Sequence, residues 1–588
     1  MEISTKIFVL STMFALFSVH SYVTSIHAPA VLITQNTGAL TLISLNITPG
    51  SGHVTVSGPY SVGQSTQQSA MSAVTYAAAY TGINSSNYNF SYYINDPNVS
   101  VSGPSAGLAF TLLAISGIEH KQLYNDFTVT GTINSNGDIG EIGGVYDKMQ
   151  AAKASGMKYA LVPAVPPGSF YNLLYFITQT QSGMPMVEIS NVSQALKYAY
   201  ANGNPILPLQ YNISSSYNLD NLPYANITCT ICNVSYFGTL TNYTINQTAL
   251  EINSISSAYG VTKAQMLQQL SKYAEMAQKG YLYVGADLAF LQYQNAFVLA
   301  NTKYYNLGST KALLDNISTY CSSLTPPQMT NNNYEYVIGG QLRQEWGLYN
   351  IQSDIQALNT PNITTDQILN GLSVASASQE WCGAANEMYS IASQMGGQDI
   401  QLSPQVKYAA LNYINIAKNY GNNIYLSTAM ESYNDSNYGT ALYGSIYAAV
   451  LNNPDLMSNY TVGEIENMTI SNAKNSTFGV WPSQFGNEAM FYVYESSLRP
   501  NDLSNLSSGY TVSVLAKNLN NANKLILNSS IISQSNSTLN VTQEITGIQT
   551  SISQIYYVLL VISIVIIAIL VTLIAILIKI GKKPQRRR

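Results

Sequence analysis

The feature that most constrains this chain is an uncharged apolar run near its C-terminal end, residues 558–578. Tyr556 and Tyr557 precede the run, and Lys579 and the basic sequence GKKPQRRR follow it. A helix needs about 20 apolar residues to span a bilayer, with Lys and Arg favoured on the cytoplasmic side. We therefore predict a transmembrane helix over residues 555–580 and a basic cytoplasmic tail over residues 581–588.

The opposite end of the chain predicts export. Residues 1–6 include Lys6, residues 7–19 form the apolar run IFVLSTMFALFSV, and small residues follow as far as Ala30. A cationic start, a short apolar run and a small-residue exit are typical of a secretory signal peptide. We predict such a segment over residues 1–30, with an uncleaved N-terminal anchor as the alternative. The chain is then a single-pass membrane protein whose bulk lies outside the cytoplasm.

Composition supports a folded, exported protein. Charged residues make up 9% of the chain, against about 25% in an average soluble protein. Because 46% of the residues are hydrophobic, charge-driven disorder is excluded. The net charge of −5 offers no basic footprint for nucleic acid. The 20 N-x-[ST] sequences permit surface glycosylation. Few ionisable groups also predict a stability that varies little with pH.

Four cysteines are consistent with an oxidising compartment. Cys229, Cys232, Cys321 and Cys382 predict one or two disulfides, and the sequence leaves the pairing open. The pair Cys229-x-x-Cys232 is alternatively a metal or redox site. It has no second such pair and no histidine nearby, so we expect no metal.

Residues 38–200 alternate short β-branched segments with helical ones, which is typical of an α/β domain. We predict strands at 40–48, 53–58, 88–96, 126–133 and 159–164, and helices at 65–80, 105–118 and 145–155. The turn Pro49-Gly50-Ser51-Gly52 between the first two strands predicts a hairpin. We place this domain at residues 31–202.

The remaining exported part differs in composition. Residues 203–244 form an Asn-rich connector that holds two of the cysteines, and residues 245–554 are predicted to be mainly helical. Segments such as 263–280 and 406–421 carry Ala, Leu and Tyr at helical spacing. No fixed repeat period is present. We interpret the Tyr stripes as packed core and surface rather than as a binding cage.

Two common catalytic motifs are absent. The chain has no GxxxxGK[ST] sequence for phosphate and no HExxH for zinc. A Ser-His-Asp triad would have to use His53 or His120. Ser105 instead lies in Gly103-Pro104-Ser105-Ala106-Gly107 at the start of an apolar helix. A lysine can serve as base for such a serine if burial lowers its pKa.

The residues around Ser105 resemble a known family. GPSAG, followed by VTGTINSNGDIGEIGGVYDKMQAAKASGMKYALVPA, is similar to the proteolytic domain of Lon proteases, which are Ser-Lys peptidases. Upstream, GHVTVSGPYSVGQSTQQSAMSAVTYA is similar to the segment that precedes the nucleophile in that family. The resemblance covers about residues 38–200. Ser105 and Lys148 have the spacing of the family dyad. Ser102 departs from the Asp that many members carry there.

The resemblance implies a site and a chemistry. Ser105 would be the nucleophile, Lys148 the general base and Thr130 the hydroxyl that supports the lysine. Backbone N–H groups of Ser105 and Ala106 would hold the oxyanion. The other predicted site residues shape the loops around the dyad: Gly103, Pro104, Gly107, Gly143 and Gly144. No cofactor and no metal are expected. The structural alternatives are that Ser105 caps its helix and that Lys148 is a solvated cation.

We accordingly predict a Lon-type proteolytic domain of the α+β/α/β class, a mainly α-helical domain and one C-terminal transmembrane helix. The predicted function is an ATP-independent, membrane-anchored serine endopeptidase that acts on unfolded or flexible polypeptides. The chain carries no ATPase module of the kind found in classical Lon enzymes. The helical region is a candidate cap, substrate collector or homo-oligomer surface. The alternative function is an inactive surface scaffold on a vestigial peptidase fold.

Overall fold

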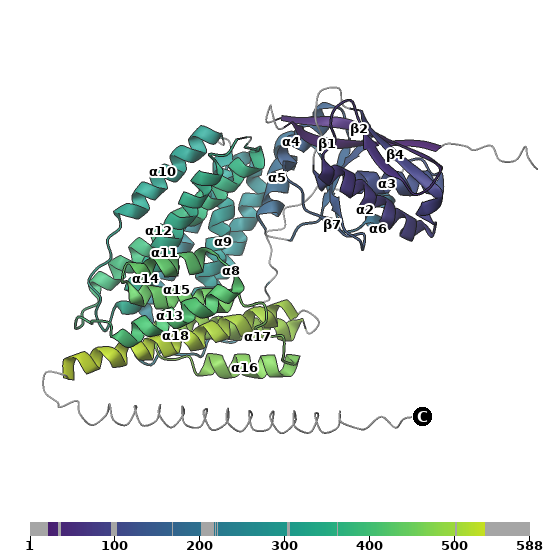
Figure 1. Ribbon diagram of the computed structural model, residues 1–588. Coiled ribbons are helices and arrows are strands. Elements are labelled where there is room, and N and C mark those ends of the chain that lie inside the picture. Colours follow the sequence, from purple (N-terminus) through teal and green to yellow (C-terminus); the bar gives the residue numbers. More distant parts are fainter. Residues whose placement is uncertain are drawn as a thin grey trace, which may run out of the picture.

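The computed structural model describes a mixed α/β domain followed by a helical region (Figure 1). The described residues are 22–32, 37–95, 103–166, 169–200, 217, 219, 221–302, 306–361, 363–499 and 503–535. The predicted transmembrane helix, the cytoplasmic tail and Ser102 lie outside these residues, as does most of the predicted signal segment. In the part of the chain that is described, no helix is both long and apolar enough to span a membrane.

A seven-stranded mixed sheet forms the core of the first domain, in the order β3-β4-β2-β1-β5-β8-β9. The strands are β1 (Tyr22–Leu32), β2 (Thr37–Pro49), β3 (Val54–Ser57), β4 (Tyr88–Asn95), β5 (Phe127–Val129), β8 (Tyr159–Pro163) and β9 (Met186–Ile189). Strand β2 is antiparallel to β1 and to β4, and the β1-β5-β8-β9 half is parallel. A separate small ribbon pairs β6 (Thr132–Ile133) with β7 (Ile139–Gly140).

Strand β1 corrects the predicted domain boundary. It begins at Tyr22 and pairs with β2 from Tyr22 opposite Ile47 to Leu32 opposite Thr37. Ile26 and Ala28 are buried in the sheet. Residues 22–30 are therefore a central strand of the domain rather than the end of a signal segment, because their apolar side chains complete the sheet's core.

The predicted hairpin between residues 40–48 and 53–58 is wrong. Strand β4 lies between β2 and β3, and β3 runs parallel to β4. The N–H groups of Gly50 and Gly52 donate to the carbonyls of Asn87 and Tyr88, at the start of β4. The turn is thus tied to β4, which directs β3 to the outer edge of β4.

Helices cover both faces of the sheet. On one face, α2 (Gln64–Thr81), α3 (Gly107–Glu119) and α6 (Val192–Ala199) pack in one hydrophobic cluster with the strands. On the other face, α4 (Val145–Ala154) and α5 (Phe170–Ser182) contribute to a second cluster. Alternate residues of β8 divide between the two: Tyr159 and Leu161 join the first, Ala160 and Val162 the second. Such coverage on both sides is typical of parallel strands.

The helical region begins at Ser235, ten residues before its predicted start. Its helices are α7 (Ser235–Ser254), α8 (Gly260–Gln278), α9 (Leu282–Asn301), α10 (Leu307–Ser323), α11 (Tyr334–Ala357), α12 (Thr365–Gln394), α13 (Pro404–Ala417), α14 (Ile424–Asn434), α15 (Tyr438–Leu451), α16 (Val462–Lys474), α17 (Val480–Leu498) and α18 (Leu503–Ser535). Disulfides join Cys229 to Cys232 and Cys321 of α10 to Cys382 of α12.

The two regions share one hydrophobic cluster. Val145 and Met149 of α4 and Leu173 of α5 belong to the same cluster as Met266 of α8 and Ala296 of α9. Figure 1 shows α4 and α5 between the sheet and the helices of the second region. The helical region therefore packs against the α4/α5 side of the first domain, which is the side that carries Lys148.

Buried carboxyl groups of the helical region change the expected pH dependence of stability. Burial raises the pKa of Glu335 and Glu345 to about 7, of Asp354 to about 6 and of Glu380 to about 8. Between roughly pH 4.5 and pH 7 the folded protein keeps protons that the unfolded chain has lost, so the free energy of unfolding falls as pH rises. We expect a higher unfolding temperature at pH 5 than at pH 7.5 by scanning calorimetry. Equal or reversed temperatures would contradict this.

Candidate active site

The turn that presents Ser105 is set by two glycines. Ser105 lies in a short 3₁₀ turn, Pro104–Ala106, directly ahead of α3. Gly103, which precedes the turn, has φ of 129°, a backbone conformation that L-residues rarely adopt. A Cβ at Gly107 would lie 2.8 Å from Ser69 Oγ and 3.1 Å from the Ile133 nitrogen, so a larger residue would have to displace the Ser69 hydroxyl of α2. The motif Gly-Pro-Ser-Ala-Gly is therefore a requirement of local geometry.

Three hydroxyl groups of α2 hold this turn in place by hydrogen bonds. The N–H of Gly103 donates to Ser65 Oγ at 3.0 Å, and Thr66 Oγ1 donates to the Gly103 carbonyl at 3.1 Å. Ser69 Oγ donates to the Pro104 carbonyl at 3.1 Å. Pre-set hydrogen bonds of this kind hold a nucleophile in place before substrate arrives.

The structure brings Ser105, Lys148 and Thr130 together. Lys148 Nζ donates to Ser105 Oγ at 3.1 Å and to Thr130 Oγ1 at 3.5 Å. Thr130 follows β5, and its hydroxyl donates to the Ser105 carbonyl at 3.3 Å, while the N–H of Gly131 donates to the same carbonyl at 2.8 Å. The end of β5 therefore ties the nucleophile turn to the lysine.

Burial gives Lys148 the properties of a base. Its side chain is 4% exposed, and burial lowers its pKa to about 8, although the negative charge of Asp366 raises it in part. About a tenth of such an amine is neutral at pH 7. A neutral amine at this distance can take the proton of Ser105 Oγ. The alternative reading of Lys148 as a solvated cation is wrong.

A carboxylate of the helical region caps the helix that carries Lys148. The N-cap of α4 is Gly144, at φ 66°, and it has no side chain to offer. Asp366 of α12 accepts the N–H of Val145 through Oδ2 at 2.7 Å and the N–H of Tyr146 through Oδ1 at 3.1 Å. A carboxylate at this position satisfies helix N–H groups that have no acceptor within the helix.

The cap is reciprocal. Thr365, the first residue of α12, donates its hydroxyl to Asp147 Oδ1 at 2.8 Å and its N–H to Asp147 Oδ2 at 3.4 Å. Asp147 lies in the first turn of α4, and Asp366 lies in the first turn of α12. Each helix thus supplies the carboxylate that stabilises the start of the other. Lys148 directly follows Asp147 in α4 and is therefore next to this contact between α4 and α12.

A cleft of about 880 Å³ opens onto the dyad between the two regions. From the first domain it is lined by Ser105, Lys148 and the predicted residues Gly103, Pro104, Ala106, Gly143 and Gly144, among others. From the helical region it is lined by Asp354, Leu358, Thr364, Asp366, Gln367 and Asn370, among others. Thr130 and Gly107 lie beneath it and are buried. The helical region therefore forms one wall of the cleft.

The arrangement also leaves room for an oxyanion. Ser105 and Ala106 precede α3, and the first N–H groups of a helix have no acceptor within it. The helix dipole favours negative charge at the same point. His53 and His120 are exposed and are not among the residues that line the cleft, so neither could complete a triad.

The first domain matches a family model. Residues 23–202 match the Lon protease (S16) C-terminal proteolytic domain. They have the Lon proteolytic fold. Similar curated proteins include "Lon protease 2" of Herpetosiphon aurantiacus, 30% identical over 23% of this chain and 17% of that protein. The "Lon protease" of Mycoplasma mycoides is 32% identical over 22% of this chain and 17% of the relative, and that of Neorickettsia sennetsu 25% identical over 29% and 20%.

The chain thus spans about a fifth of the length of the curated relatives it matches. The Lon-type domain starts at residue 23 in this comparison, which agrees with β1 as its first strand. The family and these relatives are proteases by name, of the serine type. The match to the family model ends at residue 202, before the helical region that forms the opposite wall of the cleft.

Sequence analysis missed the residues that the helical region contributes. Asp366 and Thr365 lie in the sequence Thr364-Thr365-Asp366-Gln367, in which Thr364 and Gln367 form a capping box at the start of α12. A Thr and a Gln three residues apart are a readable sign of a helix start. Nothing local in that sequence says that the helix start lies against α4.

Within the described ranges, no group of three or more His, Cys, Asp or Glu side chains is placed to hold a metal ion. The pair Cys229 and Cys232 is joined as a disulfide.

Proposed function

We propose that this protein is a serine endopeptidase that hydrolyses unfolded or flexible polypeptides through Ser105 and Lys148. The observation that carries the proposal is the partly buried 3.1 Å contact between Lys148 Nζ and Ser105 Oγ, both of which line an open cleft. The match of residues 23–202 to the Lon proteolytic domain supports it independently. A cleft of this size accommodates an extended chain but not a folded domain.

The reaction follows from the positions of the two side chains. Ser105 Oγ attacks the carbonyl carbon of the scissile bond while neutral Lys148 takes the hydroxyl proton. The N–H groups of Ser105 and Ala106 stabilise the oxyanion. The lysine ammonium then gives its proton to the departing amine, the C–N bond breaks and an acyl-enzyme remains. Water attacks the ester, Lys148 takes a proton from it, and Ser105 leaves with that proton restored.

The fall of kcat/KM toward low pH, the acid limb of the activity profile, should report the protonation of Lys148. Because only the neutral amine is a base, and its pKa is about 8, kcat/KM is expected to rise about tenfold per pH unit below pH 8 and to level off above it. Initial rates with an unfolded substrate between pH 5 and pH 9.5 test this. Circular dichroism at each pH controls for unfolding. A profile that is already flat from pH 5 would contradict a lysine base.

The cellular setting is also part of the proposal. We infer a membrane-anchored, outward-facing enzyme from the apolar run at residues 558–578 and the basic tail. ATP independence is supported by the absence of a phosphate-binding GxxxxGK[ST] sequence and by the helical region, which occupies one side of the cleft.

ATP independence has a direct test. The full-length protein is expected to cleave an unfolded protein at the same rate with and without Mg-ATP, since the helical region lies where it forms one wall of the cleft. Fragment release on a gel gives the rate, and apyrase treatment removes residual nucleotide. A several-fold stimulation of cleavage by ATP, or no cleavage in the absence of ATP, would overturn this part of the proposal.

A further inference from the structure

A second cavity lies wholly within the helical region, away from the cleft. Its volume is about 250 Å³, and its lining comes from α7, α9, α11, α12, α14, α15, α17 and α18. Glu380 lines it from α12, about 20 Å along that helix from Asp366. The exposed Leu451 belongs to the same lining, so the cavity reaches the surface. The peptidase mechanism uses none of these residues.

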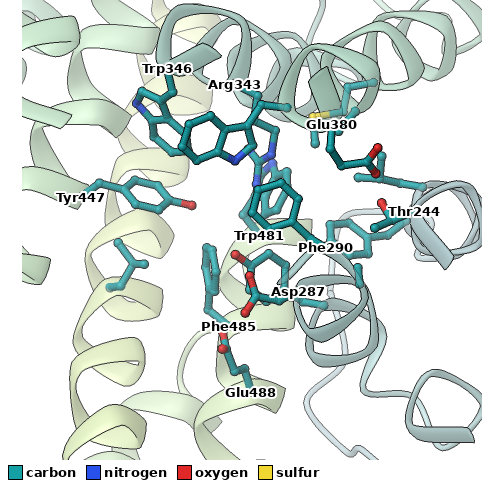
Figure 2. A pocket seen from close by; sticks show the side chains of 18 of the residues that line it. Thr244, Asp287, Phe290, Arg343, Trp346, Glu380, Tyr447, Trp481, Phe485 and Glu488 are labelled. Atoms are coloured by element: carbon teal, nitrogen blue, oxygen red, sulfur yellow. The ribbon is translucent and has the colours of Figure 1, made fainter. Parts of the chain in front are cut away.

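Acidic groups outnumber the basic one in this cavity. Asp287, Glu380 and Glu488 line it together with Arg343 (Figure 2). Glu380 and Glu488 are 3% and 6% exposed. Glu380 Oε1 and Glu488 Oε2 have no hydrogen-bond partner among the described residues. Two buried carboxyl oxygens without a donor are costly to a folded protein, and a bound donor would satisfy them.

Arg343 does not supply that donor to Glu380 or Glu488. Its guanidinium donates to the Gly339 carbonyl at 3.0 Å and lies 4.4 Å from the centre of a Trp481 ring. Its positive charge acts mainly beside Asp287, whose pKa it lowers against the effect of burial. The positive charge of Arg343 therefore already acts on the backbone of α11, on the Trp481 ring and on the Asp287 carboxyl group.

Aromatic rings form much of the remaining wall. Figure 2 shows the rings of Trp346, Tyr447, Trp481 and Phe485 around the space, with Phe290 between the Glu380 and Asp287 groups. Ring faces carry negative electrostatic potential and attract cations. The tyrosines interpreted from the sequence as packed core and surface thus include Tyr447, which also lines a cavity.

We propose that this cavity binds a small organic cation that carries a primary ammonium or a guanidinium group. The unpartnered carboxyl oxygens would accept its N–H groups, and the rings would hold its charged head and apolar stem. A metal ion fits less well, because the described residues offer no cluster of three or more ligating side chains. The cation is a free amine or the Lys or Arg side chain of a polypeptide.

Tryptophan fluorescence provides a direct measurement of binding. The chain has three tryptophans, Trp346, Trp381 and Trp481, and all three line this cavity. Full-length Ser105→Ala protein is titrated with agmatine, with n-butylamine and with neutral n-butanol. We expect a saturable change in intensity or wavelength with the two cations and none with the alcohol. No change with either cation, or an equal change with n-butanol, would overturn the proposal without any variant at the cavity.

A matched pair of variants locates the site. Glu380→Gln should raise the dissociation constant for agmatine by about tenfold or more, because a bound cation would stabilise the ionised form of Glu380, whose pKa burial raises to about 8, and the amide cannot ionise. Glu466→Gln, at an exposed glutamate of α16, should leave it unchanged. Equal affinities of Glu380→Gln and the parent protein would reject this site. Circular dichroism confirms that both variants are folded.

A competition experiment distinguishes a free amine from a polypeptide side chain as the source of the cation. A lysine-containing decapeptide and its lysine-acetylated twin are competed against agmatine on the Ser105→Ala protein. Displacement by the lysine form alone assigns the cavity to a polypeptide side chain. Displacement by neither form, with agmatine still bound, assigns it to a free amine. Equal displacement by both forms would contradict recognition of a cation.

Discussion

Replacing Ser105 by alanine is expected to abolish cleavage of an unfolded protein, with a loss of more than about 1,000-fold in kcat/KM. The Ser105 hydroxyl lines the cleft and accepts a hydrogen bond from Lys148 Nζ at 3.1 Å. The substitution removes one oxygen from a partly exposed position and leaves the glycine-defined turn intact. Initial rates with a fluorescent unfolded substrate give the measurement. Retention of activity within tenfold of the parent would reject Ser105 as nucleophile.

Lys148→Met should cause a loss of the same order. Methionine fills a similar volume but has no amine to take the Ser105 proton. The unfolding temperature should equal or exceed that of the parent, because burial lowers the pKa of Lys148 and the buried ammonium therefore costs stability. Lys153→Met is the matched control, since Lys153 is exposed on the same helix. Equal losses in both variants would mean that general damage to α4, not loss of the base, explains the result.

Asp366→Ala is expected to reduce kcat/KM by about 10- to 100-fold, although Asp366 belongs to the helical region and takes no part in bond making. It removes the acceptor for the N–H groups of Val145 and Tyr146, at 2.7 and 3.1 Å, and so loosens the helix start that places Lys148. Asp366 is thus a positioning residue. Asp315→Asn, at an exposed position of α10, is the control and should leave activity unchanged.

The pH profile separates this role from mere destabilisation. The charge of Asp366 raises the pKa of Lys148 against the lowering caused by burial. Without that charge the acid limb of kcat/KM should move to lower pH, even while the maximum rate falls. An unchanged acid limb with a reduced maximum would show that Asp366 supports the fold but does not act on the lysine. An unchanged maximum would contradict the cap as a catalytic requirement.

The dyad was predicted from the resemblance to the Lon family, and the segments that carry Ser105 and Lys148 have readable local sequence. Glycines at 103 and 107 are demanded by a positive φ and by contact with α2, so the turn around Ser105 leaves a readable motif. The start of α4 is likewise marked by Gly143-Gly144. Predicted segments such as 65–80 and 145–155 match α2 and α4 closely, because helical spacing of buried residues is a strong signal.

Non-local packing was not predictable in the same way. The contact between Asp366 and Val145 joins residues 221 positions apart, and no sequence pattern encodes it. Residues 22–30 of strand β1 were assigned to the signal segment because short polar and small residues follow the apolar N-terminal run, and only pairing with β2 reveals their role. The cation cavity depends on gaps between eight helices. Helical periodicity reports which residues are apolar but not where packing leaves space.

The central claim is that Ser105 is a nucleophile activated by Lys148. A fluorophosphonate probe, applied to the full-length protein and followed by digestion and mass spectrometry, tests it most directly. We predict one covalent adduct, on Ser105, in the parent protein and in Lys153→Met, and none in Lys148→Met. Absence of an adduct in the folded parent protein, or an adduct on a different serine, would contradict the account and favour an inactive scaffold.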